Sequence, residues 1–186
     1  ALHDGQHALA ERFDLAVVPS ARLALRGLQR QPATPQRALA LGESSRLVHA
    51  AAEARFVAGL FAQGQAFVGE QATIDTLCRH APGADVIHLA CHAQFRSDNP
   101  MFSALHLHDA ALTVERAEAL PLQSAIVVLS ACETGLAQQG GGDEQVGLVR
   151  AFLVAGASRV LASLWPVDDR ITAAFMARFY GELRQG

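Results

Sequence analysis

The sequence predicts an α/β fold in which a mostly parallel sheet is covered by helices on both faces. Short runs of aliphatic and β-branched residues alternate with helical segments, and this alternation is typical of parallel sheets with crossover helices. The most apolar run spans residues 125–131 and stops at Cys132, where polar residues and glycines follow. A second run begins at Asp85 and stops in the same way at His92. Such runs indicate strands buried on both faces.

Length and composition favour one domain with a sizeable core. The chain has 186 residues, of which 51% are hydrophobic and 18% charged, so we expect a single domain over residues 1–186. No apolar run approaches the ~20 residues that span a bilayer, and the N-terminal residues lack a signal-peptide pattern. We therefore expect a cytoplasmic protein without a membrane partner. A net charge of −3 also gives no electrostatic reason to expect direct binding of nucleic acid.

The first half of the chain contains short strands and helices in alternation. Its expected strands are residues 13–18, 37–41 and 66–68. Its expected helices are residues 20–30, capped by Ser20, a segment that follows residues 42–45, and residues 73–79. Residues 31–36 include two prolines and are expected to form an exposed turn.

The second half repeats the alternation with stronger signals. Its expected strands are residues 85–92, 125–131 and 160–165, and its expected helices are residues 113–118, 146–155 and the last segment, capped by Asp168 or Asp169. Leucines and histidines alternate over residues 103–109, which predicts a small antiparallel ribbon. Gly156 stands where a helix commonly ends in a left-handed residue. The buried stripe of the last helix is expected to comprise Ile171, Phe175, Met176, Phe179 and Leu183.

Two of these strands are expected to bring a cysteine and a histidine to one edge of the sheet. The carboxyl ends of parallel strands meet at the edge where open α/β folds place their chemistry. Cys132 would supply a nucleophile and His92 a base. Because a free thiol of pKa ~8.5 is only a few per cent thiolate at neutral pH, a neighbouring imidazole is the usual activating group.

The remaining cysteines and histidines favour structural interpretations. Three cysteines without paired spacing indicate reduced thiols; Cys91 lies inside a strand and is expected in the core, and Cys78 in the core or partly exposed. His88 is expected to order its strand or a neighbouring loop, since in an extended strand it lies ~13 Å from His92 and cannot share a metal with it. His106 and His108 could share one face of a strand, but no further zinc ligand is evident. We therefore expect neither a metal nor a cofactor.

Five blocks in a fixed order resemble one known family. They are His88–His92, Asn99–Leu105, Leu129–Gly135, Gly142–Glu144 and Ser163–Asp169, with a further match at Val18–Arg22. Together they resemble the CHAT domain, a caspase-like peptidase domain that is often fused to tetratricopeptide repeats. The resemblance covers essentially the whole chain and implies a caspase-like three-layer α/β/α fold with a mostly parallel central sheet. It also implies a Cys-His dyad, as in caspases and separase, made of Cys132 and His92.

The resemblance implies a cytosolic cysteine endopeptidase that acts on protein or peptide substrates. The chain would then be one domain of a longer protein, controlled by a tetratricopeptide-repeat or other sensor region. The backbone N–H groups of Cys132 and Ala93 could form an oxyanion hole. Ala93 replaces the glycine usual in the family, which would disturb this hole only if the position required a positive φ.

Further residues are candidates for substrate binding and regulation. The substrate-binding candidates are Ser130, Trp165, Asp168 and Asp169. We expect one of the two aspartates to cap the last helix and the other to favour a lysine or arginine before the cleaved bond, with a mid-sized apolar residue as the second preference. The expected regulatory loop includes Gly140, Gly141, Gly142, Asp143 and Glu144. Two alternatives remain: a catalytically silent scaffold, and an enzyme that stays latent until a partner orders this loop.

Overall fold

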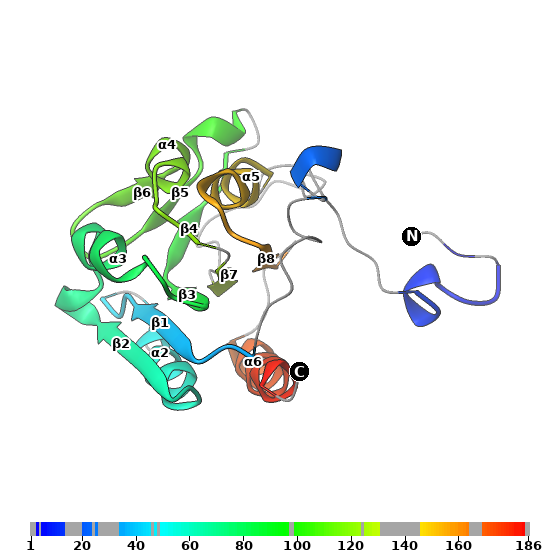
Figure 1. The fold of residues 1–186 in the computed structure, drawn as a ribbon, viewed down its shortest axis with the longest axis horizontal. Helices are drawn as coiled ribbons and strands as arrows, with labels where there is room; N and C mark the ends of the chain where they lie inside the picture. The colour runs from blue at the N-terminus through cyan, green and yellow to red at the C-terminus, as the bar shows by residue number, and fades with distance from the viewer. Residues whose placement is uncertain are drawn as a thin grey trace.

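The computed structural model describes most of the chain (Figure 1). The described residues are 3, 5–13, 20–23, 25, 34–45, 47, 49–96, 99–123, 125–130, 146–163 and 169–184. Residues 14–18 of the expected strand 13–18 lie outside them, as do the glycine-rich loop at 136–144 and the last residues expected in the strand 160–165. Of the expected helix 20–30, residues 21–23 and 25 are helical, and the Ser20 Oγ accepts a hydrogen bond from the Leu23 N–H at 3.3 Å.

The centre of the fold is a five-stranded sheet in which every pair is parallel. Its strands are β1 (Arg37–Gly42), β2 (Gln63–Val68), β3 (Val86–Ala90), β7 (Ile126–Ser130) and β8 (Arg159–Ala162), in the spatial order β2-β1-β3-β7-β8. The chain first moves outward from β1 to β2, then returns and continues through β3 to the opposite edge. The direction of travel therefore reverses between β1 and β3, which is where open α/β sheets leave a crevice at their carboxyl edge.

Helices cover both faces of this sheet and make three layers (Figure 1). One face carries α2 (Ala50–Gly59) and α6 (Asp169–Leu183), and the other carries α3 (Ile74–His80), α4 (Val114–Glu118) and α5 (Val146–Ala155). Short 3-10 turns occur at η1 (Leu9–Glu11), η2 (Gly69–Gln71) and η3 (Pro100–Phe102). The α/β class, the mostly parallel sheet and the three-layer arrangement expected from the sequence are confirmed.

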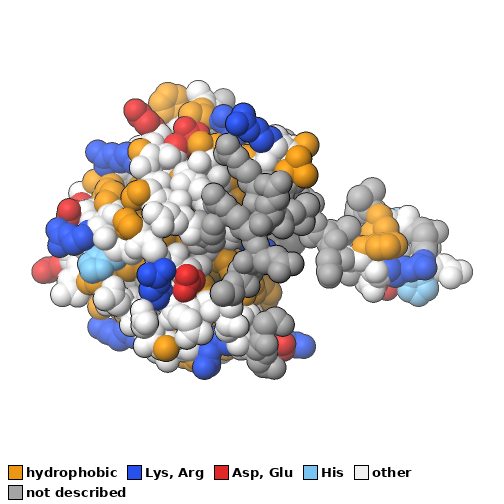
Figure 2. Space-filling model, viewed as in Figure 1, with side chains coloured by type: hydrophobic (Ala, Val, Ile, Leu, Met, Phe, Trp, Pro, Cys, Tyr) orange, Lys and Arg blue, Asp and Glu red, His pale blue; other side chains and the backbone are white. Residues whose placement is uncertain are grey.

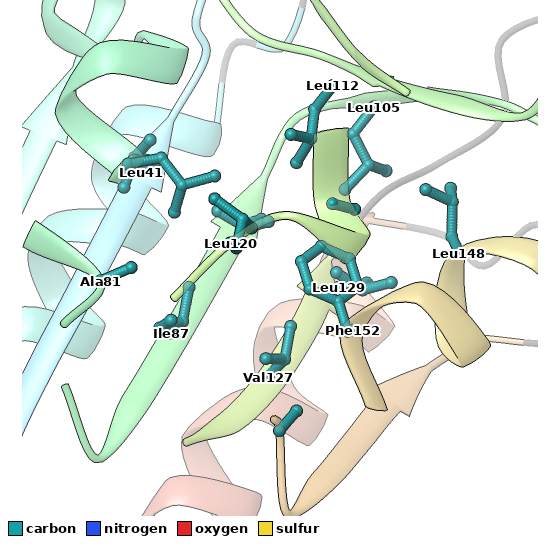
Figure 3. Close-up of a cluster of buried hydrophobic side chains, with 14 of the residues drawn as sticks. Leu41, Ala81, Ile87, Leu105, Leu112, Leu120, Val127, Leu129, Leu148 and Phe152 are labelled. Carbon is teal, nitrogen blue, oxygen red and sulfur yellow. The ribbon is translucent and has the colours of Figure 1, made fainter. Parts of the chain in front are cut away.

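Successive residues of the central strands contribute to two different hydrophobic clusters. On the α3, α4 and α5 face the cluster includes Leu41, Ile87, Val127, Leu129 and Phe152 (Figure 3). On the α2 and α6 face it includes the intervening residues Ala40, Val86, Val128, Met176 and Tyr180. Because side chains alternate across a strand, only an uninterrupted apolar run can supply both clusters.

A second, antiparallel sheet lies next to the carboxyl end of β3. It contains β4 (His92–Gln94), β5 (Ala104–His106) and β6 (Ala111–Thr113), which confirms the ribbon expected near residues 103–109. The prediction of one strand over residues 85–92 was wrong, because β3 ends at Ala90 and His92 begins β4. His92 pairs with His106 of β5 instead of continuing along the parallel sheet. The chain therefore leaves the central sheet just before the candidate histidine.

The helix boundaries depend on capping residues and close backbone approaches. Thr73 and Thr113 cap α3 and α4 by accepting backbone N–H bonds, as their sequence positions indicated. Gly156 follows α5 with φ +115°, a conformation that favours glycine. Helix α2 begins only at Ala50, so Leu47, which was expected in it, precedes the helix. Gly42 at the end of β1 lies so close to the start of α2 that a Cβ would collide with the Ala50 carbonyl.

The expected buried stripe of α6 was partly wrong. Met176 is 5% exposed, and Phe179 and Leu183 also pack against the core, but Ile171 and Phe175 are 63% and 51% exposed. The large residue that is fully buried is Tyr180. Each helical residue turns by about 100°, so a face centred on residues 176, 179, 180 and 183 leaves residues 171 and 175 outside.

The surface carries a mixture of charges. On the face shown in Figure 2, basic and acidic side chains are interspersed, in keeping with 15 basic and 18 acidic residues in the whole sequence. Within the part of the chain that the structure describes, no helix combines the length and apolar character that a bilayer span requires.

Candidate active site

The candidate site lies where β1, β3 and β7 end at the carboxyl edge of the parallel sheet. Gly42 and Ser130 are the register partners of Ala90, on either side of it. Just beyond Gly42, the Glu43 N–H donates to the Ala90 carbonyl oxygen at 2.9 Å. The residues that follow these strands therefore leave the sheet from the same place.

His92 follows this edge by two residues and is held by the antiparallel sheet. It is 5% exposed and lies opposite His106, whose side chain is partly exposed. Residues directly opposite on antiparallel strands present their side chains on the same face. The sequence did not single out His106 as a neighbour of the candidate base, and only the pairing of β4 with β5 brings it there.

Cys132 lies outside the described residues, so its distance from His92 remains a prediction. The chain nevertheless limits its position. Two residues of extended chain span at most ~7 Å, and Cys132 follows Ser130 by two residues. Ala90 and Ser130 are register partners at the ends of β3 and β7. His92 follows Ala90 by two residues, and Cys132 follows Ser130 by two residues.

Ala93 occupies the second position of β4, opposite Leu105. A strand residue has a negative φ, which any L-amino acid adopts without strain. The alanine found in place of the family glycine is therefore compatible with this backbone and keeps the N–H group.

The two cysteines in the described part of the chain have opposite environments. Cys91 is fully buried, and burial, followed by the negative charge of Glu43, raises its thiol pKa to about 12. Cys78 on α3 is exposed. The expectation that Cys91 belongs to the core is confirmed, and its thiolate population at neutral pH is too small for efficient nucleophilic attack.

The other predicted site residues fall at the edge of the described chain or beyond it. Ser130 is partly buried at the end of β7. Asp169 is the first residue of α6, but its side chain lies outside the described part. The remaining candidates also lie outside it and stay predictions: Trp165, Asp168, Gly140, Gly141, Gly142, Asp143 and Glu144.

A buried polar cluster that sequence analysis missed surrounds His88. Its Nδ1 lies 2.9 Å from the Tyr180 hydroxyl oxygen, and its Nε2 lies 3.3 Å from Glu53 Oε1. The second contact is an ion-pair approach that lacks the alignment of a regular hydrogen bond. The Ser130 hydroxyl is a further polar neighbour of the Glu53 carboxyl. The partners of His88, which was expected to order its strand or a neighbouring loop, come from the helices α2 and α6.

Glu53 remains ionised within this cluster. Burial alone would raise the pKa of its carboxyl, but the His88 imidazole and the Ser130 hydroxyl together lower it below the ordinary value of 4.5. A helical repeat could have pointed to this residue. Glu53 follows Ala50 by three positions and precedes Val57 by four, so it lies on the buried side of α2.

The described residues offer no cluster of three or more histidine, cysteine or acidic side chains that could hold a metal ion. What they offer is the buried His92 imidazole two residues beyond the end of β3, whose neighbouring strand β7 precedes Cys132 in the sequence.

The family model for the CHAT domain matches residues 1–186. No curated protein matches the chain.

Proposed function

The chain belongs to the CHAT-domain family of caspase-like, peptidase-related domains, and on that premise we propose that it is a cysteine endopeptidase with a dyad of Cys132 and His92. The observation that carries the proposal is the position of His92. His92 is buried two residues beyond the end of β3. The neighbouring strand β7, which pairs with β3, precedes Cys132 in the sequence. A base and a thiol that each follow the end of one of two neighbouring strands by two residues could come within the reach that thiol activation needs.

In the proposed reaction the Cys132 thiol gives its proton to His92 and its sulfur attacks the peptide carbonyl. The tetrahedral intermediate then expels the amine, which takes the proton from His92, and an acyl-enzyme remains. A water molecule gives a proton to His92 and attacks the thioester. Collapse of this second intermediate, with return of that proton to the sulfur, releases the acid and restores the thiol.

Two backbone N–H groups are proposed to stabilise the oxyanion. They belong to Cys132 and Ala93, and such donors typically contribute 10²- to 10³-fold to the rate. The strand conformation of Ala93 supports the proposal, because it removes the steric objection to alanine at this position.

We also propose that a fused or partner sensor region controls the enzyme. The support is the glycine-rich sequence of residues 140–142, which follows Cys132 closely. Consecutive glycines make ordering of a segment entropically costly, so a bound partner could supply the free energy for it.

Substitution of the dyad tests the proposed function. Cys132→Ala and His92→Ala should each abolish peptide cleavage, and the double substitution should cost little more than either one, because the pair acts as a unit. Cys91→Ala is the matched control and should retain activity, since Cys91 is a buried core thiol. Cleavage by Cys132→Ala, or faster alkylation of Cys91 than of Cys132, would contradict the proposal.

Peptide cleavage and cysteine alkylation in the wild-type protein separate the enzyme from a silent scaffold. A folded wild-type protein that cleaves no member of a peptide library and whose Cys132 reacts no faster than the exposed Cys78 would favour the scaffold. A latent enzyme differs from both, since its Cys132 reacts with small electrophiles before any partner is added.

A further inference from the structure

Four polar side chains form a connected row through an apolar layer of the protein. Tyr180 on α6 contacts His88 on β3, His88 contacts Glu53 on α2, and the Ser130 hydroxyl on β7 is a further polar neighbour that helps to lower the pKa of Glu53. We call these four residues the polar row. Tyr180 and His88 are fully buried, and the Glu53 side chain is 16% exposed. The row thus joins two strands of the sheet to the two helices that cover one of its faces.

The hydrogen-bonding capacities of these groups fit one another. When the imidazole proton of His88 is on Nε2, it faces the Glu53 carboxylate and leaves Nδ1 as an acceptor for the Tyr180 O–H. Burial, followed by the charge of Glu53, raises the pKa of Tyr180, so the phenol keeps its proton. His88 therefore lies between the Tyr180 hydroxyl and the Glu53 carboxylate, although its Nε2 approaches Glu53 Oε1 at 3.3 Å without the alignment of a hydrogen bond.

An apolar side chain would fill the position of Glu53 at lower cost if packing were its only task. Its neighbours on the buried face of α2 include Ala50, Ala54 and Val57. Burying a charge carries a desolvation penalty, and replacement of buried ionic groups by apolar ones is often neutral or stabilising. The position of Glu53 beside β3 and β7 indicates a role for its carboxylate other than packing.

Glu53 bridges the two strands from which the proposed dyad follows. It contacts His88, which precedes His92 by four residues, and Ser130, which precedes Cys132 by two. Ser130 is also the last residue of β7 and the partner of Ala90. His88 lies two positions before the end of β3, opposite Val128. Glu53 therefore lies beside the last part of the β3–β7 pairing, beyond which the chain continues to the proposed catalytic residues.

We propose that Glu53 is a positioning residue that acts through Ser130 and His88 to fix the ends of β7 and β3 relative to each other. The inference rests on the proposed function, since it concerns the placement of Cys132 against His92. Glu53 itself contacts neither the substrate nor the reacting atoms. Its contribution is to hold the thiol within reach of the imidazole, and a displacement of about 1 Å can reduce a rate by 10²-fold.

Alkylation of Cys132 by iodoacetamide tests this inference without a peptide substrate. In Ser130→Ala and Glu53→Gln the alkylation rate of Cys132 at pH 7 should fall by about tenfold or more. Its pH midpoint should rise toward the ~8.5 of an ordinary thiol. The direction is informative, because loss of a negative charge alone would stabilise the thiolate and lower the midpoint.

Ser158→Ala is the matched control for Ser130→Ala. Its Oγ donates to the Ala125 carbonyl oxygen at 3.3 Å, so the variant loses a partly buried hydroxyl at the opposite end of β7. The control should be destabilised to a similar degree and should keep the wild-type alkylation rate and pH midpoint. Glu118→Gln, which removes the carboxylate paired with Arg150 at 3.9 Å, is the corresponding control for Glu53→Gln.

The outcomes separate the two proposals. Wild-type rates and midpoints in both Ser130→Ala and Glu53→Gln would overturn the positioning role and leave the endopeptidase intact. A wild-type protein whose Cys132 titrates as an ordinary thiol and which cleaves no peptide would overturn the proposed function, and the positioning role with it. The inference is supported if the pH midpoint of Cys132 alkylation rises in Ser130→Ala and Glu53→Gln and stays at the wild-type value in the two controls.

Discussion

The Nδ1 of His88 lies 2.9 Å from the hydroxyl oxygen of Tyr180, although 92 residues separate them in the chain. The contact ties the C-terminal helix α6 to the middle strand of the sheet. Both side chains are fully buried, so neither can exchange its partner for water. The stability of the fold should therefore depend on this hydrogen bond.

Tyr180→Phe should lower the free energy of unfolding by about 1–3 kcal/mol, since it leaves His88 Nδ1 buried without its donor. Urea denaturation followed by circular dichroism measures the change. Ile171→Ala on the exposed side of the same helix is the control and should stay within about 0.5 kcal/mol of the wild type. Equal stability of Tyr180→Phe and the wild type would show that the hydrogen bond is energetically neutral.

The lowered pKa of Glu53 predicts a loss of stability in acid. Because the folded pKa lies below the ordinary value of 4.5, the carboxylate stabilises the fold above pH 4.5, and this contribution disappears as the pH falls through the folded pKa. The difference in unfolding free energy between the wild type and Glu53→Gln should therefore shrink as the pH is lowered from 7 to 3. A difference that stays constant over this range would refute the assignment.

The three cysteines should differ in their reaction with iodoacetamide. At pH 7.4 Cys78 should be alkylated because it is exposed, and Cys132 because of its proposed activation. Cys91, with a pKa of about 12, should react only after denaturation. Mass-spectrometric peptide mapping before and after addition of urea checks all three sites. Labelling of Cys91 in the native protein would mean that the sheet edge opens readily.

Gly42→Ala should destabilise the protein, because its Cβ would collide with the Ala50 carbonyl oxygen at the start of α2. Gly59→Ala, near the end of the same helix, meets nothing within 4 Å and should be neutral or stabilising by up to about 1 kcal/mol. Thermal unfolding of the two variants makes the comparison. A Gly42→Ala variant as stable as Gly59→Ala would show that the β1–α2 turn can relax.

Substrate preference is predicted from the sequence alone. One of Asp168 and Asp169 is expected to favour lysine or arginine before the cleaved bond, beside Trp165 as an apolar wall for the aliphatic part of that side chain. Cleavage of a peptide library by the wild type, Asp168→Asn and Asp169→Asn tests this. One of the two substitutions should reduce cleavage after basic residues, whereas a preference for aspartate in the wild type, or no change in either variant, would refute the prediction.

Local sequence signals account for much of the fold. Threonines 73 and 113 mark the starts of two helices, and Gly156 marks the end of a third. The apolar runs of β3 and β7 predict buried parallel strands because only such strands need apolar residues on both faces. These predictions succeed because capping, backbone conformation and periodicity depend on residues close together in the chain.

The structural facts that sequence analysis missed involve residues far apart in the chain. The apolar run that predicts a strand over residues 85–92 cannot show that β3 ends at Ala90, because that end depends on the pairing of His92 with β5. In α6, both possible apolar faces contain phenylalanine, and packing against the sheet decides that Tyr180 is buried and Phe175 exposed.

The sequence by itself determined the fold class, the family and the two candidate residues, His92 and Cys132, because each depends on residue type and order along the chain. Only the tertiary structure decided that Glu53, His88, Tyr180 and Ser130 form one polar row. The physical reason is that a glutamate in a helix can face either the solvent or the protein interior, and the helix sequence does not decide which. It is the packing of α2 and α6 on the sheet that removes it from water and supplies its partners.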